Sequence, residues 1–324
     1  MRSPNFWQQN GVCSKVLAPI SQLYTVAGRL SHFRRIPWQA SIPVVCIGNV
    51  VVGGAGKTPL ALSIGTRLIA RGCAVHFLTR GYGGRLKGPV CVDKDRHNAR
   101  DVGDEPLLLA DVAPTWISGN RAATAKKAIE AGADVLVMDD GMQNSTLAKT
   151  NTFLVIDGEY GFGNEKVFPA GPLRETVNEA LKRTDEVVII GSDESDLEVR
   201  LQRHVTVLKA AFIVPMEDAR ALNGHRIVAF SGIARPGKFL RTLAQIGCEI
   251  VKTYEFTDHH VFKIDEVMQI VETASKLNAT PVTTTKDAKR LPLLARPMVT
   301  ALPIEVAWQD ESALDRILDR ALVV

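Results

Sequence analysis

Apolar runs alternate with amphipathic stretches along most of this 324-residue chain. Helical spacing of apolar positions occupies residues 57–70 and 120–131, between runs that have the composition of buried strands. The strand-like runs are residues 43–50, 74–79, 134–139, 152–157 and 186–190. Continuous apolar strands separated by helices are typical of βαβ units with a parallel sheet buried on both faces. The pattern therefore predicts an α/β fold.

A second alternating set follows after residue 224 and predicts a second, smaller α/β lobe. Its strand-like runs are residues 225–232, 249–256 and 280–285, and a helix is expected from about 236 to 245. We place the boundary between the lobes near residues 213–223. The predicted domains are an N-terminal amphipathic segment at residues 1–40, a nucleotide-binding lobe at 41–215 and a C-terminal lobe at 216–324.

The N-terminal segment contains a predicted amphipathic helix at residues 14–33. Its apolar positions are Val16, Leu17, Ile20, Leu23, Tyr24, Ala27 and Leu30. Basic and aromatic residues accompany the helix, namely Arg29, Arg34, Arg35, Trp7 and Trp38. Basic residues and interfacial aromatics fit a helix that lies in a membrane surface, whereas packing on the domain core explains the apolar face equally well. The pattern alone leaves both interpretations open.

Charge is distributed unevenly along the chain. No Asp or Glu occurs from Met1 to Val92, where eleven Lys and Arg are found, although the whole chain has 39 basic and 35 acidic residues. This asymmetry indicates that the N-terminal part faces something anionic, such as nucleotide phosphates, an acidic lipid surface or a phosphorylated substrate. Nucleic acid fits the charge alone, but we find no basic helix or aromatic pattern of a nucleic-acid-binding module and do not expect one.

The five cysteines are scattered and never spaced C-x-x-C, which argues against a disulfide framework or a zinc site and favours a reducing cytoplasm. No run of about eighteen apolar residues predicts a membrane-spanning helix.

The segment GNVVVGGAGKTPL, residues 48–60, has the features of a phosphate-binding loop. Its glycines permit a tight turn that directs backbone N–H groups and a helix N-terminus at a phosphate. Lys57 would reach the β- and γ-phosphates, and the Thr58 hydroxyl would bind magnesium. The usual motif has glycine where this chain has Val51, and a ligand-free connection is the alternative interpretation. The predicted nucleotide-binding residues are Gly53, Gly54, Ala55, Gly56, Lys57, Thr58 and Pro59.

Acidic residues follow a second apolar run in DVLVMDDGMQN, residues 134–144. Asp139 and Asp140 at the end of this run would supply the second magnesium-positioning carboxylate of a phosphate-loop enzyme. An acidic turn after a strand is common by itself. Together with the glycine-rich loop, the pair predicts the other half of one nucleotide site.

Three further motifs carry polar groups with more than one interpretation. In LTRGYGGR, Arg80 and Arg85 either hold phosphate or are solvated loop residues. In VGDEPLLLA, Asp104 is either the N-cap of a helix or a catalytic carboxylate. In FPAGPLRE, a Pro-Gly turn opens a predicted helix that contains Arg174 and Glu175.

The run FTDHHVF places two adjacent histidines at the end of a predicted strand. Adjacent side chains point in different directions, so we expect one histidine to be active. A metal site formed by the pair is not expected without further ligands nearby.

Eight motifs in order resemble the tetraacyldisaccharide 4′-kinase (lipid A 4′-kinase) family. They are VGGAGKTPL, TRGYGG, GDEPLLLA, DDGMQN, FPAGPLRE, FSGIARP, DHHVF and TTTKDAKRL. The resemblance implies transfer of phosphate from ATP, with Mg²⁺, to the 4′-hydroxyl of a tetraacyldisaccharide 1-phosphate, which yields lipid IVA. It also implies two α/β lobes that close on each other, a Gram-negative source and a peripheral position on the cytoplasmic face of the inner membrane. The family's phosphate loop also lacks the first glycine.

The resemblance also implies roles for individual residues. Lys57 and Thr58 would handle the ATP phosphates and magnesium, with Asp139 and Asp140 as further magnesium ligands. Asp104 and a histidine of DHH would form the dyad that activates the sugar hydroxyl. We select His259 over His260, because relatives with DHQ keep only the first histidine. Arg174 and Glu175 would lie near the reaction centre. Asn144 departs from the family, since many relatives have histidine there, and we assign it no catalytic role.

Two other function classes use a similar loop. A nucleotide-switched binding protein, such as a partition or metallochaperone GTPase or ATPase, usually carries an N-K-x-D motif or a second lysine in the loop, and we find neither. A small-molecule kinase or ligase would not need the acid-free, amphipathic N-terminus.

Overall fold

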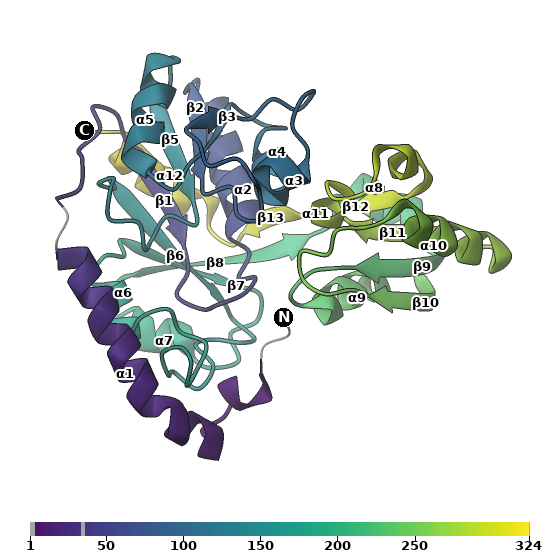
Figure 1. Ribbon diagram of the computed structural model, residues 1–324, viewed down its shortest axis with the longest axis horizontal. Coiled ribbons are helices and arrows are strands. Elements are labelled where there is room, and N and C mark those ends of the chain that lie inside the picture. The colour runs from purple at the N-terminus through teal and green to yellow at the C-terminus, as the bar shows by residue number, and fades with distance from the viewer. Residues whose placement is uncertain (1–3, 34–35, 324) are drawn as a thin grey trace.

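The computed structural model describes residues 4–33 and 36–323, with side chains for all of these except residues 29–33. Its larger sheet has nine strands in these residues, in the order β13-β8-β7-β6-β1-β5-β2-β4-β3 (Figure 1). Neighbouring strands are parallel, except that β3 is antiparallel to β4 and β13 to β8. The strands are β1 (Val44–Gly48), β2 (Val75–Thr79), β3 (Val90–Cys91), β4 (Thr115–Ile117), β5 (Val135–Asp139), β6 (Asn151–Asp157), β7 (Glu186–Ile190), β8 (Thr206–Ile213) and β13 (Glu305–Trp308).

Helices cover both faces of this sheet, so the residues of its central strands are buried at every position. On one face, α2 (Lys57–Ala70) and α12 (Glu311–Leu322) pack on residues such as Phe77 and Val155. On the other face, α5 (Arg121–Glu130) covers one half and α6 (Val177–Leu181) with α7 (Leu197–Leu201) the other. The predicted α/β fold with a buried parallel sheet is confirmed.

A second sheet has four parallel strands in the order β10-β9-β11-β12 within the described ranges. They are β9 (Arg226–Ser231), β10 (Glu249–Glu255), β11 (Thr280–Thr284) and β12 (Thr300–Leu302). The helices α8 (Met216–Leu222) and α9 (Pro236–Gln245) pack on one face, and α10 (Ile264–Lys276) with the 3₁₀ helix η2 (Leu293–Met298) on the other. Figure 1 shows this smaller layered unit beside the larger sheet.

The end of the chain returns to the first sheet, so the expected assignment of all of residues 216–324 to the second lobe is wrong for residues 305–322. Strand β13 completes the edge of β8, and α12 joins the core under α2. Asp315 of α12 pairs with Arg67 of α2, with Nε 2.5 Å from Oδ1. A pairing between strands almost a hundred residues apart has no local sequence signal, which explains the error.

The first helix, α1 (Val12–Phe33), lies along the outside of the larger unit and follows the 3₁₀ helix η1 (Asn5–Trp7) (Figure 1). Its buried side chains include two serines: Ser14 is 1% and Ser21 7% exposed. The hydroxyl of Ser21 accepts the N–H of Ala170 at 3.0 Å, and Trp7 Nε1 donates to Pro169 O at 3.1 Å. The helix thus meets the first lobe through Ser21, and through Tyr24, whose ring centroid lies 5.7 Å from that of Phe168.

The apolar face of α1 points away from the protein. Val16 is 70%, Ile20 53% and Leu23 72% exposed. The interpretation in which this face packs on the domain core is therefore wrong for these positions. Arg34 and Arg35 lie outside the described residues, as does the side chain of Arg29. Nowhere in the described part of the chain is a helix long and apolar enough to span a bilayer.

Candidate active site

The glycine-rich loop connects β1 to α2 at the carboxyl edge of the sheet. Gly56 occupies the N-cap position of α2 with φ +88°, and a Cβ added there would lie 2.3 Å from Phe212 Cζ. Both facts require glycine. Gly53 also has a positive φ, of +120°. Pro59 is in the first helical turn, where its missing N–H costs no intrahelical hydrogen bond. The loop therefore directs the N-terminus of α2 towards a common point, as a phosphate site requires.

Val51 stands where the usual motif has glycine, and the structure gives the reason. It forms an antiparallel bridge with Leu173, and the flanking backbone continues this pairing. The N–H of Val52 donates to Pro172 O at 2.8 Å, and the N–H of Arg174 donates to Val50 O at 2.7 Å. Position 51 is thus extended rather than turned. The pairing also brings Arg174 to the loop.

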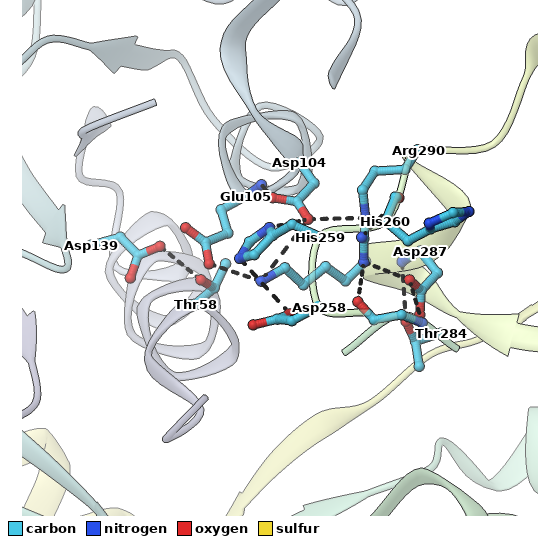
Figure 2. Close-up of polar contacts among 12 residues, drawn as sticks. Thr58, Asp104, Glu105, Asp139, Asp258, His259, His260, Thr284, Asp287 and Arg290 are labelled. Carbon is cyan, nitrogen blue, oxygen red and sulfur yellow. Dashed lines mark hydrogen bonds and ion pairs between the residues drawn. The ribbon is translucent and has the colours of Figure 1, made fainter. Parts of the chain in front are cut away.

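Asp139 lies at the end of β5 and meets the start of α2. Its Oδ2 accepts the Thr58 hydroxyl at 2.8 Å, as Figure 2 shows, and its side chain is buried. Burial, reinforced by the charge of Glu105, raises the pKa of Asp139 to about 7. Its Oδ1 has no hydrogen-bond partner among the described residues. A buried carboxylate with a free oxygen beside a hydroxyl is an oxygen donor set of the kind that magnesium prefers.

Asp140 is held by cations, in contrast to its neighbour. Its Oδ1 is 2.9 Å from Arg174 Nη1 and 3.7 Å from Lys57 Nζ, and its φ is +54°. Burial would raise the pKa of Asp140, but these two charges lower it overall. Lys57 also donates to Asn49 Oδ1 at 3.1 Å. The structure thus brings together the lysine of the loop, the acidic pair and the arginine of PLRE.

Glu175 belongs to the same group of side chains. It accepts from Gln143 Nε2 at 3.0 Å, and it also pairs with Arg183. Gln143 Nε2 donates in addition to Asn49 O at 2.9 Å, so Gln143 and Asn49 connect Glu175 to the loop. The expected placement of Arg174 and Glu175 in a helix is wrong. Both precede α6, because Thr176 caps that helix through its side chain.

Asp104 is the first residue of α4 (Asp104–Leu109), and Gly103 occupies the N-cap position. The N-cap interpretation of Asp104 is therefore wrong. Its side chain is buried, and its Oδ2 lies 3.3 Å from His259 Nδ1 (Figure 2). Burial alone would raise the pKa of Asp104. The contact with His259 and the charges of Lys286 and Arg290 outweigh it and hold the pKa at about 2.

His259 reaches Asp104 from the second lobe, on the loop between β10 and α10. Its backbone has φ +57°, and its N–H donates to Gly232 O at 3.1 Å. His260 points elsewhere: its Nε2 is 2.9 Å from Glu266, and its ring stacks on Phe256. The structure therefore places the first histidine of the pair at the carboxylate.

Two cations at this point had no role assigned from the sequence. Arg290 Nε is 3.2 Å from Asp104 Oδ2, and Lys286 Nζ is 3.0 Å from Glu105 Oε1. Both belong to the motif TTTKDAKRL, which begins at the end of β11. Basic residues directly after a strand that ends at the lobe boundary were the available signal. Glu105 in turn connects the two groups of side chains electrostatically, because its charge contributes to the raised pKa of Asp139.

Arg85 and Asn144, two other residues considered from the sequence, contact residues outside the groups of side chains described above. Arg85 is largely exposed and pairs with Asp101, with Nη2 2.7 Å from Oδ1. Asn144 Oδ1 accepts the N–H and the hydroxyl of Thr146, at 3.0 and 2.9 Å, which is a turn contact.

Comparison with known proteins identifies a family that matches almost the whole chain. Residues 13–323 match the family model described as Tetraacyldisaccharide-1-P 4′-kinase. The tetraacyldisaccharide 4′-kinase of Rhodospirillum centenum is 45% identical, over 98% of this chain and 96% of the relative. That of Rhodospirillum rubrum is 44% identical, over 100% and 98%. The crystal structure of LpxK from Aquifex aeolicus, described as an "apo" form in complex with ATP, has a TM-score of 0.77 at 23% identity. The match covers 95% of this chain and 99% of the LpxK chain, so the two chains share a fold.

Proposed function

This chain belongs to the tetraacyldisaccharide 4′-kinase family, and we propose that it transfers the γ-phosphate of ATP to the 4′-hydroxyl of a tetraacyldisaccharide 1-phosphate, forming lipid IVA in lipid A biosynthesis. One observation carries the proposal: Asp104 of the first lobe and His259 of the second meet at 3.3 Å, in the same molecule as a phosphate loop. The first lobe can hold the phosphate donor, and the contact between lobes can hold the acceptor hydroxyl.

The donor site consists of the loop amides, Lys57 and the end of β5. Lys57 is already among acceptor groups, at 3.1 Å from Asn49 Oδ1 and 3.7 Å from Asp140, so it is directed into the site rather than into solvent. Thr58, Asp139 and Asp140 would hold magnesium. When bound, this ion offsets charge on the transferring phosphoryl group and on the leaving ADP. The protein contributes position: loop amides on the phosphates, and Arg174 beside Asp140 at the same edge.

The acceptor site is formed by Asp104 and His259. Asp104 accepts a hydrogen bond from the sugar hydroxyl and orients its oxygen towards the γ-phosphate. A carboxylate with a pKa of about 2 is a weak proton acceptor. The proton therefore leaves late, after most of the bond to the leaving oxygen has broken, as a loose transition state permits. His259 orients Asp104 from across the lobe boundary, so closure of the lobes completes the site and excludes water.

The alternative of a nucleotide-switched binding protein is not favoured. Family membership over residues 13–323 argues against it. In addition, a switch protein has no need of a buried carboxylate held by three groups from a second lobe, as Asp104 is.

The lipid substrate explains the exposed face of α1. A tetraacylated disaccharide does not leave a bilayer readily, since each buried CH₂ is worth about 0.8 kcal/mol. The enzyme must therefore work at the membrane, and we assign α1 as the docking element. The absence of acidic residues before Asp93 suits an anionic membrane surface. We place the protein peripherally on the cytoplasmic face of the inner membrane of a Gram-negative bacterium, without nucleic acid as a partner.

The test is direct. The protein is incubated with labelled ATP, magnesium and the tetraacyldisaccharide 1-phosphate in mixed micelles, and the lipid products are separated. A labelled lipid with two phosphates supports the proposal. Labelled inorganic phosphate without labelled lipid would show a nucleotide hydrolase instead.

A further inference from the structure

Arg290 connects the two lobes at the predicted reaction centre. Its side chain is 4% exposed, and its Nε lies 3.2 Å from Asp104 Oδ2, as the dashed line in Figure 2 shows. The other guanidinium nitrogens bind the second lobe. Nη1 donates to His260 O at 3.0 Å, and Nη2 donates to Gly232 O at 2.9 Å. One planar group therefore contacts the carboxylate and two backbone carbonyls at once.

These two carbonyls are part of the backbone that surrounds His259. Gly232 O accepts the N–H of His259 as well as Arg290 Nη2, and His260 is the next residue along the loop. His259 has a positive φ of +57°, a conformation that non-glycine residues keep only where their surroundings hold them. Arg290 fixes this conformation, because it binds the carbonyl that accepts the His259 N–H and the carbonyl of the next residue, His260. The same guanidinium thus sets the position of the Asp104 carboxylate and the conformation of the loop that brings His259 to it.

Arg290 itself is held in place by residues of the second lobe. Its Nη2 is 2.5 Å from Oδ1 of Asp287, a fully buried carboxylate. Asp287 in turn accepts the N–H of Gly232 at 3.1 Å and the hydroxyl of Thr284 at 2.7 Å. Because both terminal nitrogens of Arg290 are bound to the second lobe, the orientation of Nε is fixed. A planar fork can hold this arrangement, and a lysine ammonium cannot make all of these contacts together.

We propose that Arg290 is a positioning residue for phosphoryl transfer, which holds Asp104 and the His259 loop in the single arrangement that accepts the sugar hydroxyl. The inference deepens the proposed kinase function and rests on it. Arg290 does not need to touch the substrate in this role. The guanidinium also faces Asp104 together with His259 and the ammonium of Lys286, so its positive charge contributes to keeping the carboxyl ionised.

Two substitutions separate the two contributions. Arg290→Met removes both the charge and the fork, whereas Arg290→Lys keeps the charge and loses the fork. Lys289→Met is the matched control, because Lys289 Nζ forms a 2.5 Å ion pair with Asp111 without contacting Asp104 or the His259 loop. Each variant is compared with wild type by steady-state kinetics with the lipid acceptor and by a carbon-13 NMR titration of the Asp104 carboxyl.

We expect kcat to fall about 100-fold in Arg290→Met, with KM for ATP unchanged, because misplacement by about 1 Å costs this much. Arg290→Lys also lowers kcat, and Lys289→Met leaves it at the wild-type value. The Asp104 carboxyl, with its pKa of about 2, stays ionised above pH about 4 in wild type and in Arg290→Lys. In Arg290→Met it begins to protonate at a higher pH, since removal of a nearby cation raises the pKa of a carboxyl.

A wild-type kcat in both Arg290 variants, or a loss of equal size in Lys289→Met, would overturn the inference. An Asp104 titration that is unchanged in Arg290→Met would do so too, because a purely structural arginine would not move it. If Arg290→Met does not fold, kinetics of Arg290→Lys decides the matter. A wild-type protein that makes no labelled lipid refutes the proposed kinase function, and the Asp104 titration still tests the hold of Arg290 on the carboxylate.

Discussion

Replacing the exposed apolar residues of α1 by serine should release the enzyme from membranes. The triple variant Val16→Ser, Ile20→Ser and Leu23→Ser removes three side chains that are 70%, 53% and 72% exposed. None of them contributes much to packing in the first lobe, which α1 contacts through Ser21 and Tyr24. The substitutions therefore change what α1 presents to a bilayer while they leave its attachment to the protein in place.

The size of the effect follows from the exposed fractions. Full burial of a side chain such as Val, Ile or Leu is worth about 1.5 to 3 kcal/mol. Between half and three quarters of each of these side chains is free to enter a membrane, so each contributes roughly 1 to 1.5 kcal/mol. The three together contribute about 3 to 4.5 kcal/mol, and their loss should weaken partitioning into vesicles by about 150- to 2,000-fold.

The assay is flotation with vesicles of zwitterionic lipid that contain an anionic phospholipid. The triple variant should remain with the soluble fraction at lipid concentrations that float the wild type. Its kcat on substrate in detergent micelles should be unchanged, because the loop from β1 to α2 and Asp104 are untouched. The control variant, Met216→Ser with Leu294→Ser, removes residues that are 66% and 81% exposed in α8 and η2, and it should float as wild type does.

Wild-type flotation of the triple variant would refute the assignment of α1 as the docking element. An equal loss in the control would refute it as well, since the effect would then reflect surface hydrophobicity in general. Deletion of residues 1–33 is a weaker test, because it also removes the contacts of Trp7 and Ser21 with residues 169–170.

Three further predictions concern the interior of the site. Asp104→Asn should lower kcat about 100-fold or more with KM for ATP unchanged, measured by steady-state kinetics. A wild-type kcat would remove Asp104 from the mechanism. Without magnesium, the free energy of unfolding should fall as pH rises from about 4 to 7, because folding raises the pKa of Asp139 and protonation stabilises the folded state. Asp139→Asn should weaken this dependence in thermal melts with chelator, and an unchanged slope would contradict the raised pKa. Gly56→Ala should lower the free energy of unfolding by roughly 2 kcal/mol or more, since the new Cβ meets Phe212. Gly132→Ala, at a position with φ +92° and open space around it, should lower the free energy of unfolding by only about 1 to 2 kcal/mol. Equal costs in denaturant unfolding would argue against the Phe212 clash.

The local elements could be predicted well, because each is written in consecutive residues. The predicted strand at residues 186–190 and the predicted helices at 57–70 and 236–245 coincide with β7, α2 and α9. The apolar positions of the two helices repeat with helical spacing, and β7 is a short, continuous run of β-branched residues after Glu186. The glycine-rich loop was evident for the same reason, since the required positive φ at Gly56 limits the residue type.

Long-range pairings left no such signal. Strand β13 completes the first sheet from the far end of the chain, and Leu173 bridges Val51 across more than a hundred residues. In α1, periodicity showed that one face is apolar but not which way that face points. The direction depends on Ser21 meeting the backbone of Ala170, a contact between segments that are distant in sequence.

The sequence by itself determined the α/β fold, the loop that can hold phosphate and the family to which the chain belongs. Tertiary structure decided how the side chains are used. It brought His259 and Arg290 to Asp104, and it distinguished Asp139 from Asp140 by burial and by nearby cations. A pKa or a hydrogen bond depends on what surrounds a group in space, and chain order fixes only the nearest neighbours.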